Sequence, residues 1–517
     1  IDSSAEVGSH RIPAHLYKIR STPRPPPISM EPSDEFVGCV PAIPEFALGC
    51  FVQVLAPPKH AGMRGHIIEI NAKGAIRIKF AQGTTWAPWE KLDHIQVVGG
   101  AVDYSDNVED ADAERTSAAH GLGAEEDHSH NYNFKLVTSE ISKRADPGDD
   151  GTNAKYRELM IEIEKTFNAR PDARRLNWER NACRTASDEE LLLGEVHTVA
   201  FIRKMRQRTA EAQSRGKPNR SYLKLADDIS AGWSQETEAA ARTGVASLID
   251  CAKEVFTGVC AHGFVLAKPP SHHAVGNAEL ARNGSQMDLP FGFCHLNSIA
   301  SAIANLREDH PKIRVCIFDF DVHPGNGNED TFWNDPRVLT ISMHQPNIFG
   351  RAMCYADHTG GEKAIGSAFN LPMLAGAQDA DYCFVVKEHV IPEIHRFKPH
   401  VVFVAVGFDA LKADPYADQE LTVFWYGWCV AELMRLGIPL VLNLEGGYDP
   451  RASARAINEC VSALAGREPA EFATCMDLGP PRSKYKEHIQ RMIDIRLQNL
   501  QSPPDGQEPR NTRNARR

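Results

Sequence analysis

Two features that define large classes of protein are missing from this chain: a long apolar segment and paired cysteines. No apolar run approaches the roughly 20 residues that a membrane-spanning helix needs, and the mean hydropathy is −0.36. The twelve cysteines are scattered without a CxxC pair, which predicts reduced thiols and an intracellular protein of the nucleus or the cytoplasm. The formal net charge of −11 disfavours nonspecific nucleic-acid binding by the whole chain. We therefore expect a globular protein with no membrane partner.

Composition divides the 517 residues into one large segment and several smaller ones. Residues 1–45 are rich in proline and serine, which predicts a disordered, Pro-rich lead-in. Residues 46–99 hold short alternating apolar runs separated by glycines, which predicts a small β-barrel. Residues 100–150 carry many acidic and few apolar side chains, as a solvated linker does. Residues 499–517 form a polar tail with a basic end.

The order of the short runs in 46–99 resembles an SH3-like barrel of the KOW or Tudor kind. Such a barrel is a candidate for binding a protein or an RNA. Trp86 and Trp89 would form part of a cage for a methylated or peptide ligand. The simpler interpretation places both rings in the core and rim of the barrel.

In residues 151–498, apolar runs alternate with helix-like segments. The runs FVLA, RVCIF, VLTIS, VVFVAV and PLVLNL are continuous, as in strands that are covered on both faces. Segments such as CHLNSIASAIANLRE and LTVFWYGWCVAELMRLG lie between them. This alternation predicts an α/β domain with an open, mostly parallel sheet and helices on both faces.

Each of the five apolar runs leads into polar residues that can carry chemistry. These are KPPSHHA (268–274), DFDVHPGNG (319–327), SMHQ (342–345), GFDALKADP (407–415) and EGGYDP (445–450). Ligands of open α/β sheets bind beyond the carboxyl ends of the strands. One polar strand end is explained by helix capping, whereas five at one edge predict a site.

A metal centre is indicated by the residues that follow two of these runs. Asp319, Asp321 and His323 stand at alternate positions, so a continuing strand would point all three the same way. Asp409 follows another run and can supply a second carboxylate. Two carboxylates and one imidazole leave a tetrahedral metal with an open position, as in catalytic zinc sites. Zn²⁺ and Fe²⁺ both fit this set of ligands.

Acid–base groups accompany the predicted metal. His272 and His273 are adjacent candidates for proton transfer, and Asp319 is placed to hydrogen-bond one imidazole. Tyr448, in a Gly-Gly-Tyr loop, can donate a hydrogen bond to an oxyanion. Taken singly, each of these features is more often structural. Their joint appearance at successive strand ends favours metal-assisted hydrolysis of a carbonyl compound.

Six motifs occur here in the order found in the zinc-dependent histone deacetylases: KPPSHHA, GFCHLN (292–297), DFDVHPGNG, SMHQ, GFDALKADP and LEGGYD. On these motifs the chain resembles the class II branch of that family, and the resemblance implies the arginase–deacetylase fold. It also implies one zinc ion held by Asp321, His323 and Asp409, with a K⁺ ion nearby.

Further roles are implied by positions that match the family motifs. His272 and His273 would be the catalytic pair. Asp319 and Asn326 would orient them, and Tyr448 would polarise the substrate carbonyl. The other implied residues are the substrate contacts Phe293, Gly292, Gly447 and Asp228, the monovalent-cation ligands Asp319, Ser342 and Met343 with the carbonyls of Asp321 and His323, and a second cation site at Phe332, Asp335 and Val338.

The implied reaction removes the acetyl group from acetyl-lysine in proteins, histones among them, and releases acetate. Of the two histidines, His273 is favoured as the base that takes a proton from water. An acidic gatekeeper at Asp357, Glu362 or Asp414 would instead favour acetylpolyamines or other acyl-amines. A weakly active acetyl-lysine-binding protein is the third interpretation. The sequence leaves the oligomeric state open.

Three departures from the family pattern are evident. Ser271 stands where the family usually has Gly, and Pro324 where it usually has His. The aromatic wall expected opposite Phe293 is not evident in 346–361. Ser271 would tighten the turn before the histidines, and the metal site should survive Pro324. We expect ordinary packing or surface roles for Cys294, His295, His344, His358, His389 and His395, with His295, His389 and His395 on helices.

Overall fold

The computed structural model describes most of the chain between residues 132 and 501, and the backbone of five strands before it. The described ranges are these strands, within 51–99, and residues 132–145, 155–215, 233–277, 279–280, 291–348, 353–476 and 478–501. Several predictions lie outside the described residues: the lead-in 1–45, most of the linker 100–150, Asp228, and the side chains of Trp86 and Trp89.

A five-stranded antiparallel sheet occupies the segment predicted as a barrel. Its strand order is β4-β3-β2-β1-β5. The pairing register shifts between Ile67 and Glu69 on β2, as at a β-bulge, which bends a strand. The bounds are β1 (Phe51–Val54), β2 (Arg64–Ile70), β3 (Ile76–Phe80), β4 (Gly83–Ala87) and β5 (Ile95–Gly99).

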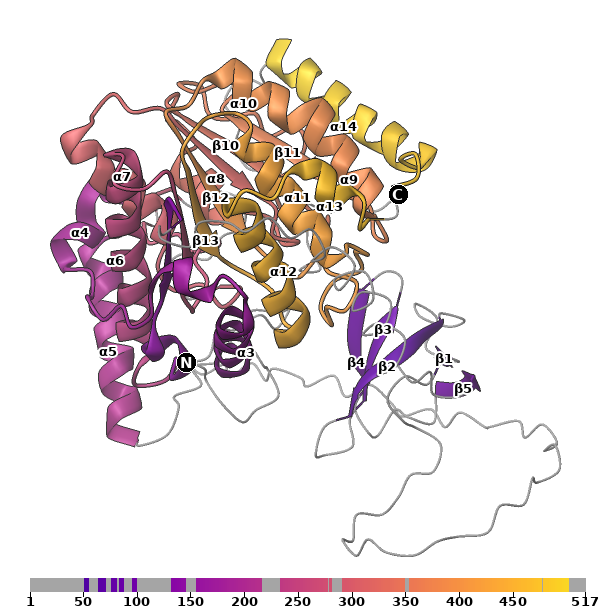
Figure 1. Ribbon diagram of the computed structural model, residues 1–517, viewed down its shortest axis with the longest axis horizontal. Coiled ribbons are helices and arrows are strands. Elements are labelled where there is room, and N and C mark those ends of the chain that lie inside the picture. Colours follow the sequence, from indigo (N-terminus) through magenta and orange to yellow (C-terminus); the bar gives the residue numbers. More distant parts are fainter. Residues whose placement is uncertain are drawn as a thin grey trace, which may run out of the picture. The chain divides into compact units, whose positions relative to one another are not determined.

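The larger part of the chain is built on an eight-stranded sheet, of order β11-β10-β9-β12-β13-β8-β6-β7, in which every strand pair is parallel (Figure 1). The predicted α/β architecture is confirmed. The strands are β6 (Phe134–Thr138), β7 (Asn177–Glu179), β8 (His262–Leu266), β9 (Val315–Asp319), β10 (Val338–His344), β11 (Ala368–Pro372), β12 (Val401–Val406) and β13 (Leu440–Leu444).

The central strands are apolar throughout because both of their faces are covered. Alternate residues of one strand enter opposite core clusters: Phe318 of β9 lies in one, and its neighbour Ile317 lies in the other. The same division separates Val402 from Phe403 on β12. Burial of each such side chain contributes about 1.5–3 kcal/mol, so the two layers of helices hold the sheet between them.

Helices of the two layers come from different parts of the chain. Helices α4 to α7 contribute to one cluster; α3 and α9 to α14 contribute to the other. The bounds are α3 (Tyr156–Ala169), α4 (Asp188–Leu192), α5 (Val199–Arg215), α6 (Thr237–Phe256), α7 (Ser298–Asp309), α8 (Asn326–Thr331), α9 (Asp379–Val385), α10 (Ile391–Phe397), α11 (Val423–Met434), α12 (Pro450–Leu464), α13 (Pro469–Ala473) and α14 (Ser483–Gln501).

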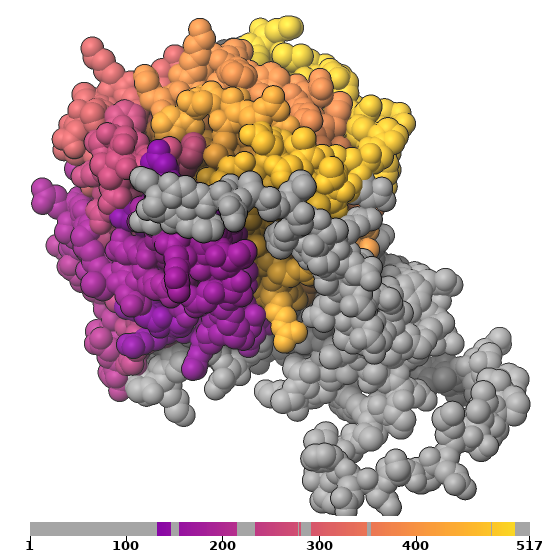
Figure 2. Space-filling view, viewed as in Figure 1, coloured from indigo at the N-terminus to yellow at the C-terminus, as the bar shows by residue number. Residues whose placement is uncertain are grey.

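Segments far apart in sequence meet within the second layer. Arg170, at the end of α3, donates hydrogen bonds to Asn458 Oδ1 (2.7 Å) and Ser462 Oγ (3.1 Å) on α12. The space-filling view shows purple residues of the early segments lying against orange residues of the C-terminal part (Figure 2). The fold therefore brings the beginning and end of this part of the chain together.

Several boundaries differ from the predictions. Strand β6 lies inside the stretch predicted as linker, and α14 extends to Gln501, inside the predicted tail. Strands β7 and β11 had no continuous apolar run to reveal them. Over the described ranges, no helix is both long and apolar enough to cross a membrane, and ten cysteines there are free thiols.

Candidate active site

The loop after β9 carries two of the predicted ligands. The strand ends at Asp319, so the prediction that the strand continues through His323 is wrong. The backbone turns instead: Asp321 N–H donates to Asp319 Oδ1 (3.1 Å), and His323 N–H donates to Asp321 Oδ1 (2.8 Å). Each carboxylate thus accepts a hydrogen bond from the backbone N–H two residues later. The resulting turn, rather than the alternation of a strand, brings these side chains together.

Asp321, His323 and Asp409 face one another in a buried group. Their ligand atoms all lie within 4.8 Å of one another. His323 Nδ1 is 3.1 Å from Asp321 Oδ1 and 2.9 Å from Asp409 Oδ2. Burial alone would lower the pKa of His323, but the two carboxylates outweigh it and raise this pKa to about 9. Two carboxylates and an imidazole that are buried and face one another fit a divalent cation.

The remaining carboxylate oxygens are held by backbone amides. Val322 N–H donates to Asp409 Oδ1 (3.0 Å), and Gly446 N–H donates to Asp321 Oδ2 (2.7 Å). A Cβ on Gly446 would lie 2.2 Å from Asp409 Oδ2 and 2.5 Å from Asp321 Oδ2. Only glycine lets the backbone approach both ligands so closely. The ligands are therefore positioned by a surrounding shell of hydrogen bonds, as in established metal sites.

The adjacent histidines lie beside this group with their rings 3.9 Å apart. His272 Nδ1 is 2.9 Å from Asp319 Oδ2, and His273 Nδ1 is 2.6 Å from Asn326 Oδ1. Burial opposes charge on His272, yet Asp319 and Asp321 raise its pKa to about 10. Burial and neighbouring imidazoles hold the pKa of His273 well below 6.5. The two rings therefore have opposite tendencies to hold a proton.

Tyr448 is buried between two aromatic rings next to the metal group. Its ring centroid lies 5.7 Å from Phe293, 4.6 Å from Tyr416 and 6.4 Å from His323. Burial, followed by the nearby Asp409 carboxylate, holds the pKa of Tyr448 well above 10. Gly447, at φ +115°, allows the turn that presents this residue. The phenol keeps its proton and can donate a hydrogen bond.

Phe293 lies beside Tyr448, and its neighbour Gly292 lies against the ring of His273. Both have positive φ, +64° and +54°, and a Cβ on Gly292 would lie 2.2 Å from His273 Cδ2. Phe293 is partly exposed beside Tyr448. Phe291 instead contacts His273, at 5.4 Å between centroids, and packs with Met353 and Ile348. These three residues form an apolar surface beside His273.

The residues predicted to bind monovalent cations lie on the strands next to the loop. Ser342 of β10 pairs in register with Asp319, and its Oγ accepts a hydrogen bond from Gly325 N–H (3.3 Å). Met343 follows it and is buried. At the second predicted site, Asp335 N–H donates to the Phe332 carbonyl and Val338 N–H donates to the Asp335 carbonyl. The structure thus groups each set of residues.

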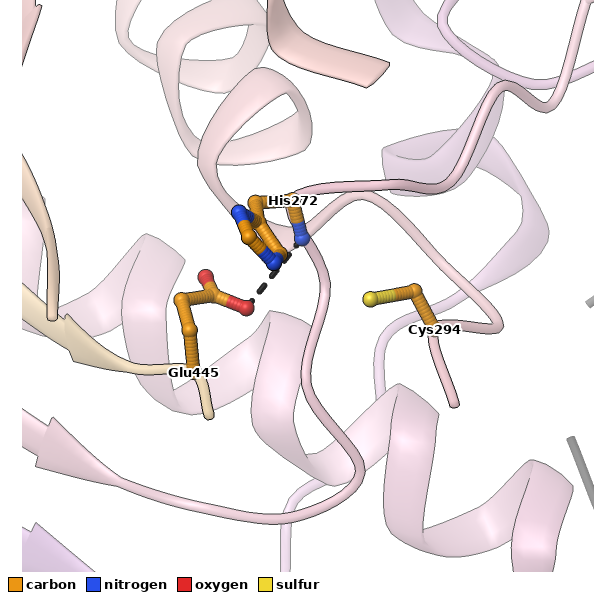
Figure 3. A group of neighbouring side chains, drawn as sticks. All are labelled: His272, Cys294 and Glu445. Atoms are coloured by element: carbon orange, nitrogen blue, oxygen red, sulfur yellow. Dashed lines mark hydrogen bonds between the residues drawn. The ribbon is translucent and has the colours of Figure 1, made fainter. Parts of the chain in front are cut away.

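Sequence reasoning assigned no role to Glu445 and considered Asp414 only as an acidic gatekeeper, and both are buried at the site. His272, Cys294 and Glu445 form a second group with ligand atoms within 4.8 Å of one another (Figure 3). Both Glu445 oxygens already accept hydrogen bonds from protein donors, including Ser271 N–H. Burial and Glu445 hold the pKa of the Cys294 thiol well above 9. The Glu445 carboxylate is therefore engaged on both oxygens by donors of the protein.

Most of the remaining histidines have the packing or surface positions that were predicted for them. His358 is partly buried and pairs with Glu329 (2.9 Å), and His344 is buried with Nδ1 2.9 Å from Ser342 Oγ. The helical placement of His295 is wrong, because α7 begins at Ser298. Its buried ring stands edge-on to Trp233 at 5.0 Å.

The comparisons with known proteins agree with this geometry. Residues 153–464 match the family described as the histone deacetylase domain. The chain is 33% identical over 241 residues to histone deacetylase 14, chloroplastic, of Arabidopsis thaliana, covering 45% of this chain and 54% of that protein. It is 30% identical over 342 residues to histone deacetylase 5 of the same plant, covering 62% and 48%. It thus spans about half the length of these relatives.

Other matches extend the comparison. An uncharacterized protein of Methanocaldococcus jannaschii is 41% identical over 186 residues, which is 36% of this chain and 51% of that protein. The crystal structure of the HDA15 HD domain has a TM-score of 0.60 at 23% identity, over 71% of this chain and 97% of that one. This likeness shows the fold. Because the family match extends over more than half of the chain, the chain belongs to the histone deacetylase domain family.

Proposed function

We propose that this protein hydrolyses the amide of acetyl-lysine in proteins, with one zinc ion per catalytic domain, and releases acetate. One observation carries the proposal: the ligand atoms of Asp321, His323 and Asp409 lie within 4.8 Å of one another, directly beside a histidine pair and a buried phenol. Zinc held by these three residues would supply a Lewis acid that polarises the amide carbonyl and acidifies water. The other steps belong to the chain's own side chains.

His273 is the proposed general base because of its hydrogen bond. Its Nδ1 lies 2.6 Å from Asn326 Oδ1, an acceptor, so Nδ1 carries the proton and Nε2 presents a lone pair. His272 meets a carboxylate at Nδ1, from Asp319, which stabilises an imidazolium. His272 is therefore suited to give a proton to the leaving amine, and Tyr448 to donate its O–H to the oxyanion.

The surroundings of Asp414 favour acetyl-lysine over acetylpolyamines. Its carboxylate is buried and accepts from Tyr416 N–H (2.8 Å) and Tyr448 N–H (2.7 Å), so both oxygens are engaged by backbone. Glu362 is exposed and Asp357 partly exposed. The ring of Tyr416 packs against Tyr448, and the ring of Phe293 also lies beside Tyr448. The apolar faces of these rings suit packing against an uncharged acyl-lysine stem.

The further parts of the proposal extend this activity. Acetylated proteins, histones among them, would be the substrates of the domain built on the eight-stranded sheet, which includes β6 before residue 151 and α14 up to Gln501. The N-terminal sheet would bind a protein or an RNA. K⁺ would bind near Asp319 and Ser342, which are paired in register. The ten free thiols favour a reducing compartment, the nucleus or the cytoplasm.

Acetate release by purified, zinc-loaded protein tests the proposal. Acetyl-lysine peptides and N-acetylspermidine are compared, with a chelator and Asp321→Ala as controls. Turnover of the peptides that both controls abolish is the expected result. Preference for N-acetylspermidine would replace protein substrates with small amines, and zinc binding without turnover of either would refute deacetylation and favour a binding role.

A further inference from the structure

Glu445 is a buried carboxylate with four hydrogen-bond donors around it. Its Oε2 accepts from Ser271 N–H (2.6 Å) and His272 N–H (3.1 Å). Its Oε1 accepts from Ser271 Oγ–H (2.8 Å) and from the Asn443 amide (2.7 Å). Charge-assisted bonds of this kind are about twice as strong as neutral ones. Figure 3 shows the carboxylate pointing at the His272 backbone.

The opposite side of the same backbone is also held. Gly327 N–H donates to the His272 carbonyl (2.9 Å), and Asn328 N–H points at the same oxygen (3.3 Å). The N–H of His272 is therefore held by Glu445, and the carbonyl of His272 is held by the first residues of α8. Since α8 begins directly after the loop with Asp321 and His323, this arrangement fixes the histidines relative to the metal ligands.

Glu445 is in turn held by its own backbone. Its carbonyl accepts a hydrogen bond from the buried Lys268 ammonium, and its N–H donates to the Val406 carbonyl (2.8 Å). The next residue, Gly446, donates to Asp321. A change in the Glu445 side chain therefore acts first on Ser271 and His272, because the backbone bonds to the metal ligand do not involve the carboxylate.

We propose that Glu445, with the Ser271 hydroxyl as a further clamp, is a positioning residue that sets the catalytic distance of His272 and His273. This inference rests on the proposed deacetylation. Ser271 contributes a bond that glycine cannot form, since its Oγ donates to Glu445 and accepts from Asn443 (3.2 Å). The substitution of serine for the usual glycine thus tightens the clamp in this chain.

Glu445→Gln is the main test, because it replaces one accepting oxygen with an NH₂ donor. This donor would face the N–H or O–H donors that the oxygen now accepts from. We expect kcat to fall on the order of 10²-fold with KM changed less than about threefold, as for misplaced catalytic groups. In a background that lacks both imidazoles (His272→Ala with His273→Ala) the same change should cost less than about threefold. Ser271→Ala should lower kcat by roughly three- to tenfold. Glu393→Gln, another buried carboxylate, is the matched control and should leave kcat near normal.

Hydrogen exchange measured by mass spectrometry gives a readout that does not depend on turnover. Peptides spanning 268–274 should lose protection in Glu445→Gln, by about tenfold or more, while peptides of α11 keep theirs. Equal loss of kcat with and without the two histidines, or unchanged protection of 268–274, would overturn the proposal. If the wild type releases no acetate, the proposed function fails, and the exchange data alone decide whether the clamp exists.

Discussion

His197 should make the folded protein sensitive to mild acid. Its ring is buried, with Nδ1 3.0 Å from the Leu191 carbonyl and Nε2 accepting from Asn297 N–H (3.1 Å). Nδ1 therefore carries the only proton, and protonation at Nε2 would set one N–H against another. Burial accordingly lowers the pKa of His197 from 6.5 to about 4.

The sign of the effect follows from proton linkage. Between pH 6.5 and 4 the unfolded chain binds a proton at His197 and the folded chain does not, so the free energy of unfolding falls as pH falls. The stabilisation is complete above pH 6.5. With 1.36 kcal/mol per pKa unit, the loss is about 1.3 kcal/mol at pH 5.5 and about 2.5 kcal/mol at pH 4.5.

Urea unfolding at pH 7.5, 6.5, 5.5 and 4.5 measures this slope. His197→Gln should lower the free energy of unfolding at pH 7.5 and should show a shallower decline toward pH 4.5, by roughly the amounts above. Exposed His395 offers the control: His395→Gln should keep the wild-type slope. If the free energy of unfolding of His197→Gln fell with pH as steeply as that of the wild type, the assignment of a neutral imidazole with two hydrogen bonds would be refuted.

Three further predictions concern the site and the core. Tyr448→Phe removes one oxyanion donor and should lower kcat on the order of 10²–10³-fold; near-normal turnover of acetyl-lysine peptides would exclude its role. Gly446→Ala places a Cβ 2.2 Å from Asp409 Oδ2 and should weaken zinc binding about 10–100-fold in chelator competition, whereas Gly479→Ala, with open space around it, should not. Phe403→Ala opens a cavity in β12 at a fully buried position and should cost about 3–5 kcal/mol in urea unfolding; a loss below about 1 kcal/mol would contradict the packing.

The elements that could be predicted are those whose local pattern and tertiary environment agree. VVFVAV is strand β12 with the predicted bounds, since six apolar residues in a row can be buried only with both faces covered. Strand β6 is only five residues long and lies in a stretch that is otherwise acidic. Strand β7 has three residues, Asn177–Glu179. Pairing with neighbours, rather than composition, makes these two segments strands.

The candidate site divides in the same way. Residue types and chain order predicted the zinc ligands, the histidine pair and Tyr448 as one group, and the fold brings these residues together. The alternation predicted through His323 failed because side-chain caps at Asp319 and Asp321 compete with strand pairing. The role of Glu445 had no local signal, since its carboxylate accepts from the backbone amides of Ser271 and His272, far away in sequence. Asp414 was considered only as a gatekeeper, whereas its carboxylate accepts from the backbone amides of Tyr416 and Tyr448.

The sequence by itself determined the kind of sheet and the chemical groups at its edge, because continuous apolar runs must be buried and the polar residues after them must lie where the strands end. Only the tertiary structure decided which hydrogen-bond donor each carboxylate oxygen accepts from. Ser271 and Glu445 are 174 positions apart, and His323 and Asp409 are 86 apart. Hydrogen bonds act over about 3 Å, so such pairings exist only after the sheet has set its strands side by side.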